Sequence, residues 1–245
     1  SVFKTFTVAA GLEDGLINTD TEFLNLEKRL QCGKSSISEY DNKIPSDLTV
    51  EQILIRSGNI GSVRIGQKLE IIKLKAFLEK IGILSKINFD IEEVGEPIPF
   101  KWGKCKLATV SFGHGITTTP LQLAKAYAII SNGGFAVEPS LIKNELKNHQ
   151  KKKRIIKAGI SEKINPILRK IVTTKEGTAG FVNIEGYEVG GKTGTAQKTI
   201  VGGYSKAKVN TFAGIFPASN PKYVLIVLLD EPKTSLDYVY EYKNK

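Results

Sequence analysis

The spacing of the apolar residues changes along the chain, and this change constrains the fold more than any other feature. In the first two-thirds, apolar residues recur at three- and four-residue intervals, as in Phe3, Phe6 and the group 8–10, which is typical of helices. Segments with strand-like patterning follow at residues 188–197, 209–217 and 223–229. Short Gly-, Asn- and Pro-containing turns separate them, which favours an antiparallel arrangement. We therefore expect an α+β domain, an antiparallel sheet flanked by helices.

Start and stop signals define several of the helices. Residues 49–52 (Thr-Val-Glu-Gln) and 119–122 (Thr-Pro-Leu-Gln) both have the capping-box pattern, and the second also has Pro at the first helical position. The first of these helices should run into Arg56, and the second should end at the Asn-Gly-Gly of 132–134. Residues 60–81 predict one or two further helices.

Composition places the chain among ordinary globular proteins. Of its 245 residues, 41% are apolar and 24% are charged, which excludes collagen-like, coiled-coil and disordered classes. The longest apolar run, 223–229, is far shorter than the roughly 18 residues that span a bilayer. The sequence contains no Met, so we expect a fragment or a processed form, with a single domain over residues 1–245.

The chain is basic, with a net charge of +10. Most of the excess lies in the run 147–154, with Lys157 just after it. No aromatic residue interrupts that run, so it lacks the stacking platform of a single-strand nucleic-acid binder. A solvated loop is the favoured interpretation and no nucleic-acid partner is expected; attraction to an anionic surface or polymer is the alternative.

The cysteines and histidines do not form a metal-binding pattern. Cys32 and Cys105 lie far apart with no ligand-type partners nearby, and neither His114 nor His149 has a carboxylate or cysteine at ligand spacing. We expect no metal, and a structural role for His114 in its glycine-flanked loop. Whether the two cysteines pair in a single long-range disulfide is left open.

The first candidate for chemistry is the pair Ser1 and Lys4. Residues three apart lie on one face of a helix, so Lys4 would lie beside the Ser1 hydroxyl. A serine becomes a nucleophile when a neighbouring base takes its proton, and a lysine can do so when its pKa is lowered. The S-x-x-K pattern alone recurs by chance in lysine-rich chains.

The second candidate is Ser57 and Asn59, at the end of the helix that runs into Arg56. A hydroxyl and a carboxamide at a helix-to-turn junction can act as proton shuttle and amide-binding group. An ordinary helix C-cap explains the same residues.

The third candidate is the strand segment Lys192, Thr193, Gly194 and Thr195. Lys192 and the two hydroxyls form a cationic ledge suited to a carboxylate, and Gly194 would let a substrate backbone approach the strand. The Thr195 N–H would contribute to an oxyanion hole. The alternative is that these residues form an ordinary polar strand end with no role in binding or catalysis.

Taken in order, S-x-x-K, S-x-N and K-T-G form the signature of penicillin-recognising serine acyltransferases. With this signature the chain resembles the transpeptidase domain of a class B penicillin-binding protein over almost its whole length, and the spacings agree with that family. The ending Asp230-Glu231-Pro232 resembles the division-specific branch. Further family-like stretches are 111–116 leading into 119–124, 177–179, 212–214 and 217–221.

The resemblance implies the penicillin-binding protein/serine β-lactamase-like fold, truncated at both ends in this chain, and a peptidoglycan D,D-transpeptidase without a cofactor. Ser1 would be the nucleophile that attacks the D-Ala-D-Ala end of a stem peptide, and Lys4 its general base. Ser57 and Lys192 would relay the proton to the leaving amine, and Asn59 would hold a substrate amide.

The resemblance also assigns the remaining site residues. Thr193, Gly194 and Thr195 would bind the substrate, with the two threonines holding its carboxylate, and β-lactams would trap Ser1. The expected partners are stem peptides, β-lactam antibiotics and cell-division membrane proteins. The expected location is the periplasmic face of the inner membrane, with the anchor missing from this sequence. The residues 238–245 do not resemble the family's C-terminal helix.

Two alternatives remain. A serine β-lactamase shares the fold and the three motifs, but it needs a group that activates the deacylating water, and no E-x-x-L-N element is present; residues 22–25 come one residue short of it. A non-catalytic penicillin-binding scaffold or sensor is the second, and the complete catalytic set argues against it.

Overall fold

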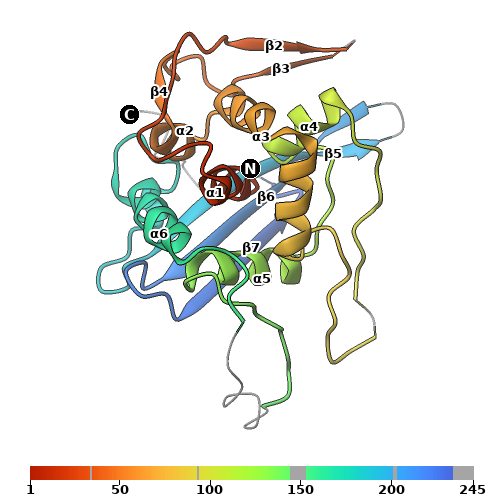
Figure 1. Cartoon of the computed structure of the whole chain (residues 1–245), viewed down its shortest axis with the longest axis vertical. Coiled ribbons are helices and arrows are strands. Elements are labelled where there is room, and N and C mark those ends of the chain that lie inside the picture. The colour runs from red at the N-terminus through yellow and green to blue at the C-terminus, as the bar shows by residue number, and fades with distance from the viewer. Residues whose placement is uncertain (34, 93, 144–152, 201–202, 234–245) are drawn as a thin grey trace.

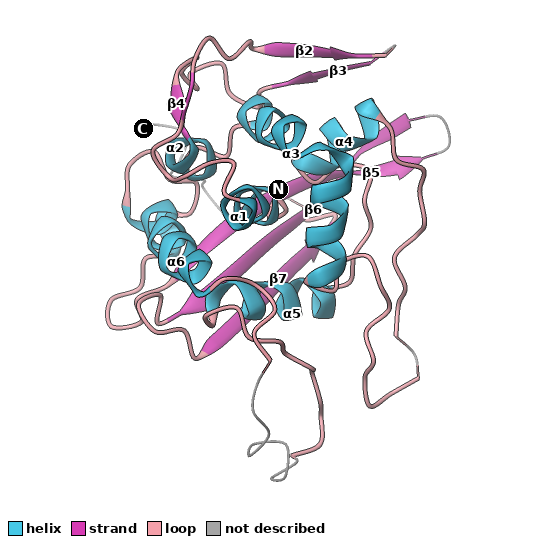
Figure 2. Ribbon diagram, in the orientation of Figure 1, coloured by secondary structure: helices cyan, strands magenta, loops and turns pink. Residues whose placement is uncertain are grey.

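The computed structural model describes residues 1–33, 35–92, 94–143, 153–200 and 203–233. Its main sheet has three antiparallel strands in the order β5 (Gly190–Ile200), β6 (Gly203–Phe216) and β7 (Tyr223–Asp230). Lys192 pairs with Ala213, and Ala213 pairs with Ile226 on the next strand. The predicted antiparallel sheet is confirmed, although β6 begins at Gly203, before the expected residue 209 (Figures 1 and 2).

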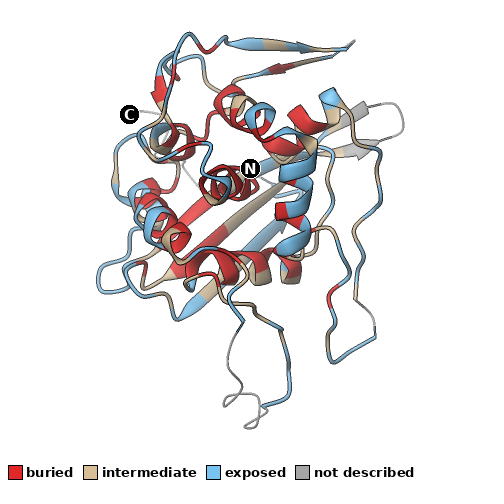
Figure 3. Cartoon of the chain, in the orientation of Figure 1, coloured by how far each residue is buried: buried red, intermediate tan, exposed pale blue. Residues whose placement is uncertain are grey.

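Helices surround a central first helix. The α-helices are α1 (Lys4–Asp14), α2 (Val50–Ile55), α3 (Asn59–Lys80), α4 (Lys104–Ser111), α5 (Pro120–Ser131) and α6 (Ala158–Thr173). Every residue of α1 from Lys4 to Leu12 is buried, which Figure 3 shows as a red helix in the middle of the molecule. Contacts with α2, α3 and α6 enclose α1, while α6 packs on β5 and α5 packs on β6 and β7. The α+β class is therefore confirmed.

The predicted caps are present. In α2 the Thr49 hydroxyl accepts from the Gln52 N–H while the Gln52 side chain accepts from the Thr49 N–H. The same reciprocal pair joins Thr119 and Gln122 at the start of α5. The region predicted as one or two helices is α3, which is interrupted at Glu70, where φ is +60°.

Two small antiparallel pairs were not predicted. Strand β1 (Glu22–Phe23) pairs with β4 (Leu48–Thr49), and β2 (Arg29–Cys32) pairs with β3 (Ser35–Ser38). The β2–β3 hairpin lies at the top of Figure 1, above α3. A disulfide between Cys32 and Cys105 joins the hairpin to α4, which answers the question left open by the sequence.

Several sequence features lie outside the described residues, including 147–152 of the basic run, His149 and the stretch 238–245. At the end of the basic run, Arg154 stacks over the ring of Phe135, 4.5 Å from its centre. Within the described part of the chain, no helix is both long and apolar enough to cross a bilayer.

Candidate active site

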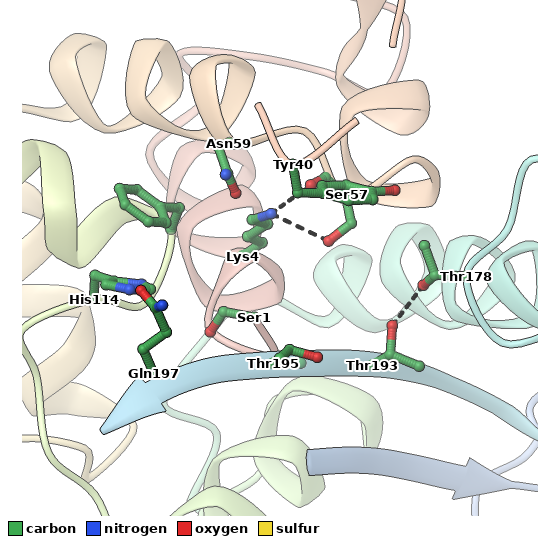
Figure 4. A pocket seen from close by; sticks show the side chains of 12 residues that line it. Ser1, Lys4, Tyr40, Ser57, Asn59, His114, Thr178, Thr193, Thr195 and Gln197 are labelled. Carbon is green, nitrogen blue, oxygen red and sulfur yellow. Dashed lines mark hydrogen bonds between the residues drawn. The ribbon is translucent and has the colours of Figure 1, made fainter. Parts of the chain in front are cut away.

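Ser1 and Lys4 enter the site from the start of α1. The Ser1 hydroxyl is partly exposed and accepts a hydrogen bond of 3.2 Å from the Phe3 N–H. Lys4, in contrast, is buried with only 1% of its surface exposed. Its Nζ donates to the Ser57 carbonyl and, at 3.1 Å, to the Ser57 hydroxyl. Both side chains face the same pocket, with Ser1 between Lys4 and strand β5 in Figure 4.

Ser57 lies in the tight turn between α2 and α3, where its φ is +57°. This left-handed conformation is uncommon for a residue other than glycine, and residues held in it gather at functional sites. The Ser57 hydroxyl lies between two amines, because Lys192 Nζ also donates to it at 2.8 Å. The turn therefore places one hydroxyl within hydrogen-bond distance of both lysines.

Burial lowers the pKa of both lysines. Burial lowers the Lys4 pKa from its ordinary value to about 7, and the charge of Glu39 partly opposes this effect. The Lys192 side chain is fully buried; burial first, and the charge of Lys4 second, hold its pKa well below the ordinary value. A neutral amine that can accept a proton is therefore accessible near pH 7 at Lys4.

Two glycines allow the chain to close around Ser1. A Cβ at Gly194 on β5 would lie 2.9 Å from Val2 N and 3.1 Å from Ser1 Cα. A Cβ at Gly113, whose φ is +86°, would overlap the Ser1 hydroxyl. The sequence interpretation assigned the bare backbone of Gly194 to the approach of a substrate. In the structure it makes room for Ser1 and Val2, which lie just before α1.

The remaining predicted residues lie along β5 and at the start of α3. The Thr193 hydroxyl bonds to that of Thr178 at 2.6 Å, while Thr195 is exposed. Asn59 begins α3, and its Nδ2 donates to the Ser38 carbonyl at 2.8 Å. In Figure 4 its side-chain oxygen is the end nearer to Lys4.

These groups line a pocket of about 470 Å³. The lining residues are Ser1, Lys4, Tyr40, Ser57, Asn59, Phe112, His114, Thr178, Thr193, Gly194, Thr195 and Gln197. The predicted residues therefore come together, except that Lys192 lies behind the wall and reaches the pocket through Ser57.

Sequence reasoning missed five members of the wall as site residues: Tyr40, Phe112, His114, Thr178 and Gln197. Three of them lie in the family-like stretches 111–116 and 177–179, which carried no residue role. His114 was assigned a structural role; it lies on the pocket wall, with its ring 5.0 Å from that of Phe112, and burial lowers its pKa. Within the described ranges no cluster of three or more His, Cys, Asp or Glu could hold a metal ion.

Comparison with known proteins places the chain in a family. Residues 1–245 match the family described as penicillin binding protein transpeptidase domain. A probable peptidoglycan D,D-transpeptidase PenA of Neisseria flavescens is 31% identical over 237 residues, which cover 95% of this chain and 57% of that protein. A probable peptidoglycan D,D-transpeptidase FtsI of Caulobacter vibrioides is 29% identical, covering 95% of this chain and 41% of that protein. The chain thus spans about half the length of these relatives.

Solved structures of similar proteins support the same family assignment. The transpeptidase domain of Burkholderia pseudomallei penicillin-binding protein 3 superposes with a TM-score of 0.86 at 25% identity, covering 94% of this chain and 70% of that one. Penicillin-binding protein 3 of Mycobacterium tuberculosis, complexed with aztreonam, superposes with a TM-score of 0.84 at 25% identity, covering 95% and 56%. Together, the match over 1–245, the fold and the relatives show that the chain belongs to the penicillin-binding protein transpeptidase domain family, class B.

Proposed function

We propose that residues 1–245 act as one peptidoglycan D,D-transpeptidase domain, which works through a serine acyl-enzyme and binds penicillin. The observation that carries the proposal is the single hydroxyl of Ser57 held between Lys4 and Lys192, with Ser1 in the same pocket. This arrangement supplies a nucleophile, a base and a path for the proton.

Acylation begins with proton transfer from the Ser1 hydroxyl to neutral Lys4. A lysine pKa of about 7 suits this task, since a general base works best when its pKa is near the working pH. Ser1 Oγ then attacks the carbonyl carbon of the penultimate D-alanine. The N–H groups of residues 1 and 195 would donate to the resulting oxyanion. In other enzymes, removing one such donor slows the reaction by roughly 10²–10³-fold.

Collapse of the tetrahedral intermediate breaks the peptide bond and releases the terminal D-alanine. Its nitrogen needs a proton, and Lys4 can return one through Ser57 and Lys192, which the hydrogen bonds of 3.1 and 2.8 Å support. An amine of a neighbouring stem peptide then attacks the acyl-enzyme carbonyl and gives a proton to the relay. Collapse of this second intermediate breaks the ester bond to Ser1, the relay returns the proton to Ser1 Oγ, and the new amide bond is the cross-link.

Strand β5 and Asn59 would bind the substrate. Thr193 and Thr195 would hold the terminal carboxylate. Because Asn59 Nδ2 is engaged by the Ser38 carbonyl, Asn59 would offer its oxygen to a substrate N–H.

The test is labelling of the full-length protein with a fluorescent penicillin, followed by peptide mass mapping of the adduct. We expect the adduct on Ser1 and no labelling of Ser1→Ala, which should unfold at the same temperature as the parent. Labelling that survives Ser1→Ala would overturn the proposal. Rapid hydrolysis of a cephalosporin reporter would instead favour a β-lactamase, and absence of any adduct on folded protein would favour a scaffold.

We also propose a role in cell division at the periplasmic face of the cell membrane, with division membrane proteins as partners. The relative named FtsI supports the division role. Localisation of a fluorescent fusion to the division site would test it, and a uniform distribution around the cell would contradict it.

A further inference from the structure

Three consecutive residues at the end of β3 hold the turn that carries Ser57. The Ser38 carbonyl accepts from Asn59 Nδ2 at 2.8 Å, on the α3 side of the turn. The Tyr40 hydroxyl donates to the Arg56 carbonyl at 2.8 Å, on the α2 side. Both ends of the turn are therefore held by the same short segment, where the chain leaves the β2–β3 hairpin (Figure 1).

Glu39, between Ser38 and Tyr40, holds the middle of the turn with its carboxylate. One oxygen accepts from the Asn59 N–H at 2.7 Å, and the other accepts from the Ile60 N–H at 2.9 Å. These are two of the first N–H groups of α3, which have no partner within the helix. The N-cap residue is Gly58, which has no side chain to take them. A carboxylate from a distant segment thus serves as the cap, in a position that the helix dipole favours.

Glu39 also acts electrostatically on the site. Lys4 and Lys192 are buried and share one hydroxyl, so each disfavours a charge on the other. The ionisable side chains that interact electrostatically with Lys4 are Glu39, Lys192 and His114. Of these, only Glu39 is negative, and its effect opposes that of burial.

We propose that Glu39 is a positioning residue for acylation: its carboxylate fixes the Ser57–Asn59 turn against Lys4 and Lys192 and supplies a negative charge that acts on Lys4. This inference rests on the proposed acyl-enzyme function. Glu39 does not line the pocket, so it acts through Ser57, Asn59 and Lys4 and not on the substrate.

The test compares Glu39→Gln, Glu39→Asp and Glu51→Gln in the full-length protein by measuring penicillin acylation rates between pH 5 and 9. Gln keeps the size of the side chain but removes the charge and one acceptor. We expect at least a ten-fold slower acylation on the high-pH plateau, since small misplacements of catalytic groups cost this much or more. We also expect the midpoint of the pH–rate curve to move to lower pH, because a lysine without its anionic partner loses its proton more easily.

Glu51→Gln is the matched control, because it removes a carboxylate from the first turn of α2 that pairs with exposed Lys170. It should leave the midpoint unchanged. Glu39→Asp retains the charge and should retain the midpoint even if the plateau falls. A Glu39→Gln midpoint equal to that of the parent would overturn the inference while Ser1 labelling still stands. Failure of the parent to label at Ser1 would instead contradict the proposed function itself.

Discussion

Lys192 Nζ donates a hydrogen bond of 2.8 Å to the hydroxyl of Ser57 from a side chain with no exposed surface. Lys192 is not part of the pocket lining, and its Nζ contacts the wall at the Ser57 hydroxyl and, at 3.1 Å, at the Thr193 carbonyl. Lys192 can therefore influence the reaction through Ser57 and through the position of strand β5, without contacting the substrate itself.

Replacing Lys192 should stop most of the acylation. We expect Lys192→Ala to slow acylation by on the order of 10²-fold or more, because it removes the second half of the proton relay. Lys198→Ala is the control on the same strand, where the amine pairs with Asp230 and Glu231 away from Ser57, and it should change the rate little. The measurement is a stopped-flow rate with a fluorescent penicillin. Equal losses in the two variants would show that Lys192 has no specific role in acylation.

The rate of acylation should rise with pH through neutrality. Lys4 has a pKa of about 7 because it is buried, and it acts as a base only when neutral. The neutral fraction grows from about a tenth one pH unit below the pKa to about nine-tenths one unit above it. We therefore expect a roughly ten-fold rise between pH 6 and pH 8, measured at constant ionic strength with circular dichroism recording the fold. A rate that is flat or falls over this range would exclude Lys4 as the base.

Gly113→Ala should damage the site more than the fold. A methyl group at this position would overlap the Ser1 hydroxyl and lie 2.7 Å from Phe3 Cβ. We expect acylation to fall by at least ten-fold, as expected for a displaced nucleophile. Gly186→Ala is the matched control, since Gly186 has nearly the same φ, +84°, with nothing near the added Cβ. Both variants should lose about 1 kcal/mol to backbone strain, and similar acylation rates in both would contradict the argument.

The Cys32–Cys105 disulfide should stabilise the protein substantially. It closes a loop across a sequence separation of 73 residues, for which the chain-entropy estimate is about 4 kcal/mol. We expect the reduced protein, or the double substitution of both cysteines by serine, to melt on the order of 10 °C lower. Acylation should also slow, because the hairpin that the disulfide anchors leads directly into Glu39. Identical melting curves with and without a reductant would show that the bridge does not stabilise the fold.

Local signals were sufficient for the elements that carry the site. The capping boxes at Thr49 and Thr119 begin α2 and α5, because their hydrogen bonds join residues only three positions apart. The order of the three motifs in the sequence likewise predicts Ser1, Lys4 and Ser57 as site residues without reference to any contact between them. Their assembly in one pocket agrees with that selection, while their roles stay predictions.

Contacts between distant segments could not be predicted in the same way. Nothing in the residues around Glu39 shows that its carboxylate caps α3, because the partners, the N–H groups of Asn59 and Ile60, are ordinary backbone. The β2–β3 hairpin has only a weak local signal, because each strand is four residues long, β3 is mostly serine, and β2 offers only Leu30 and Cys32 as alternating apolar residues. Helix α6 has buried isoleucines at helical spacing, but Pro166 inside it weakens the local helix signal.

Gly113 and Gly194 lie so close to Ser1 that few substitutions at either position can be tolerated. Any other amino acid at either position would place a carbon atom against Ser1, so almost every coding change there should be eliminated. Gln197, by contrast, lines the same pocket with an exposed side chain. Heritable variation that alters which antibiotics a cell tolerates should therefore accumulate at exposed lining positions such as Gln197, while the two glycines beside Ser1 stay the same from lineage to lineage.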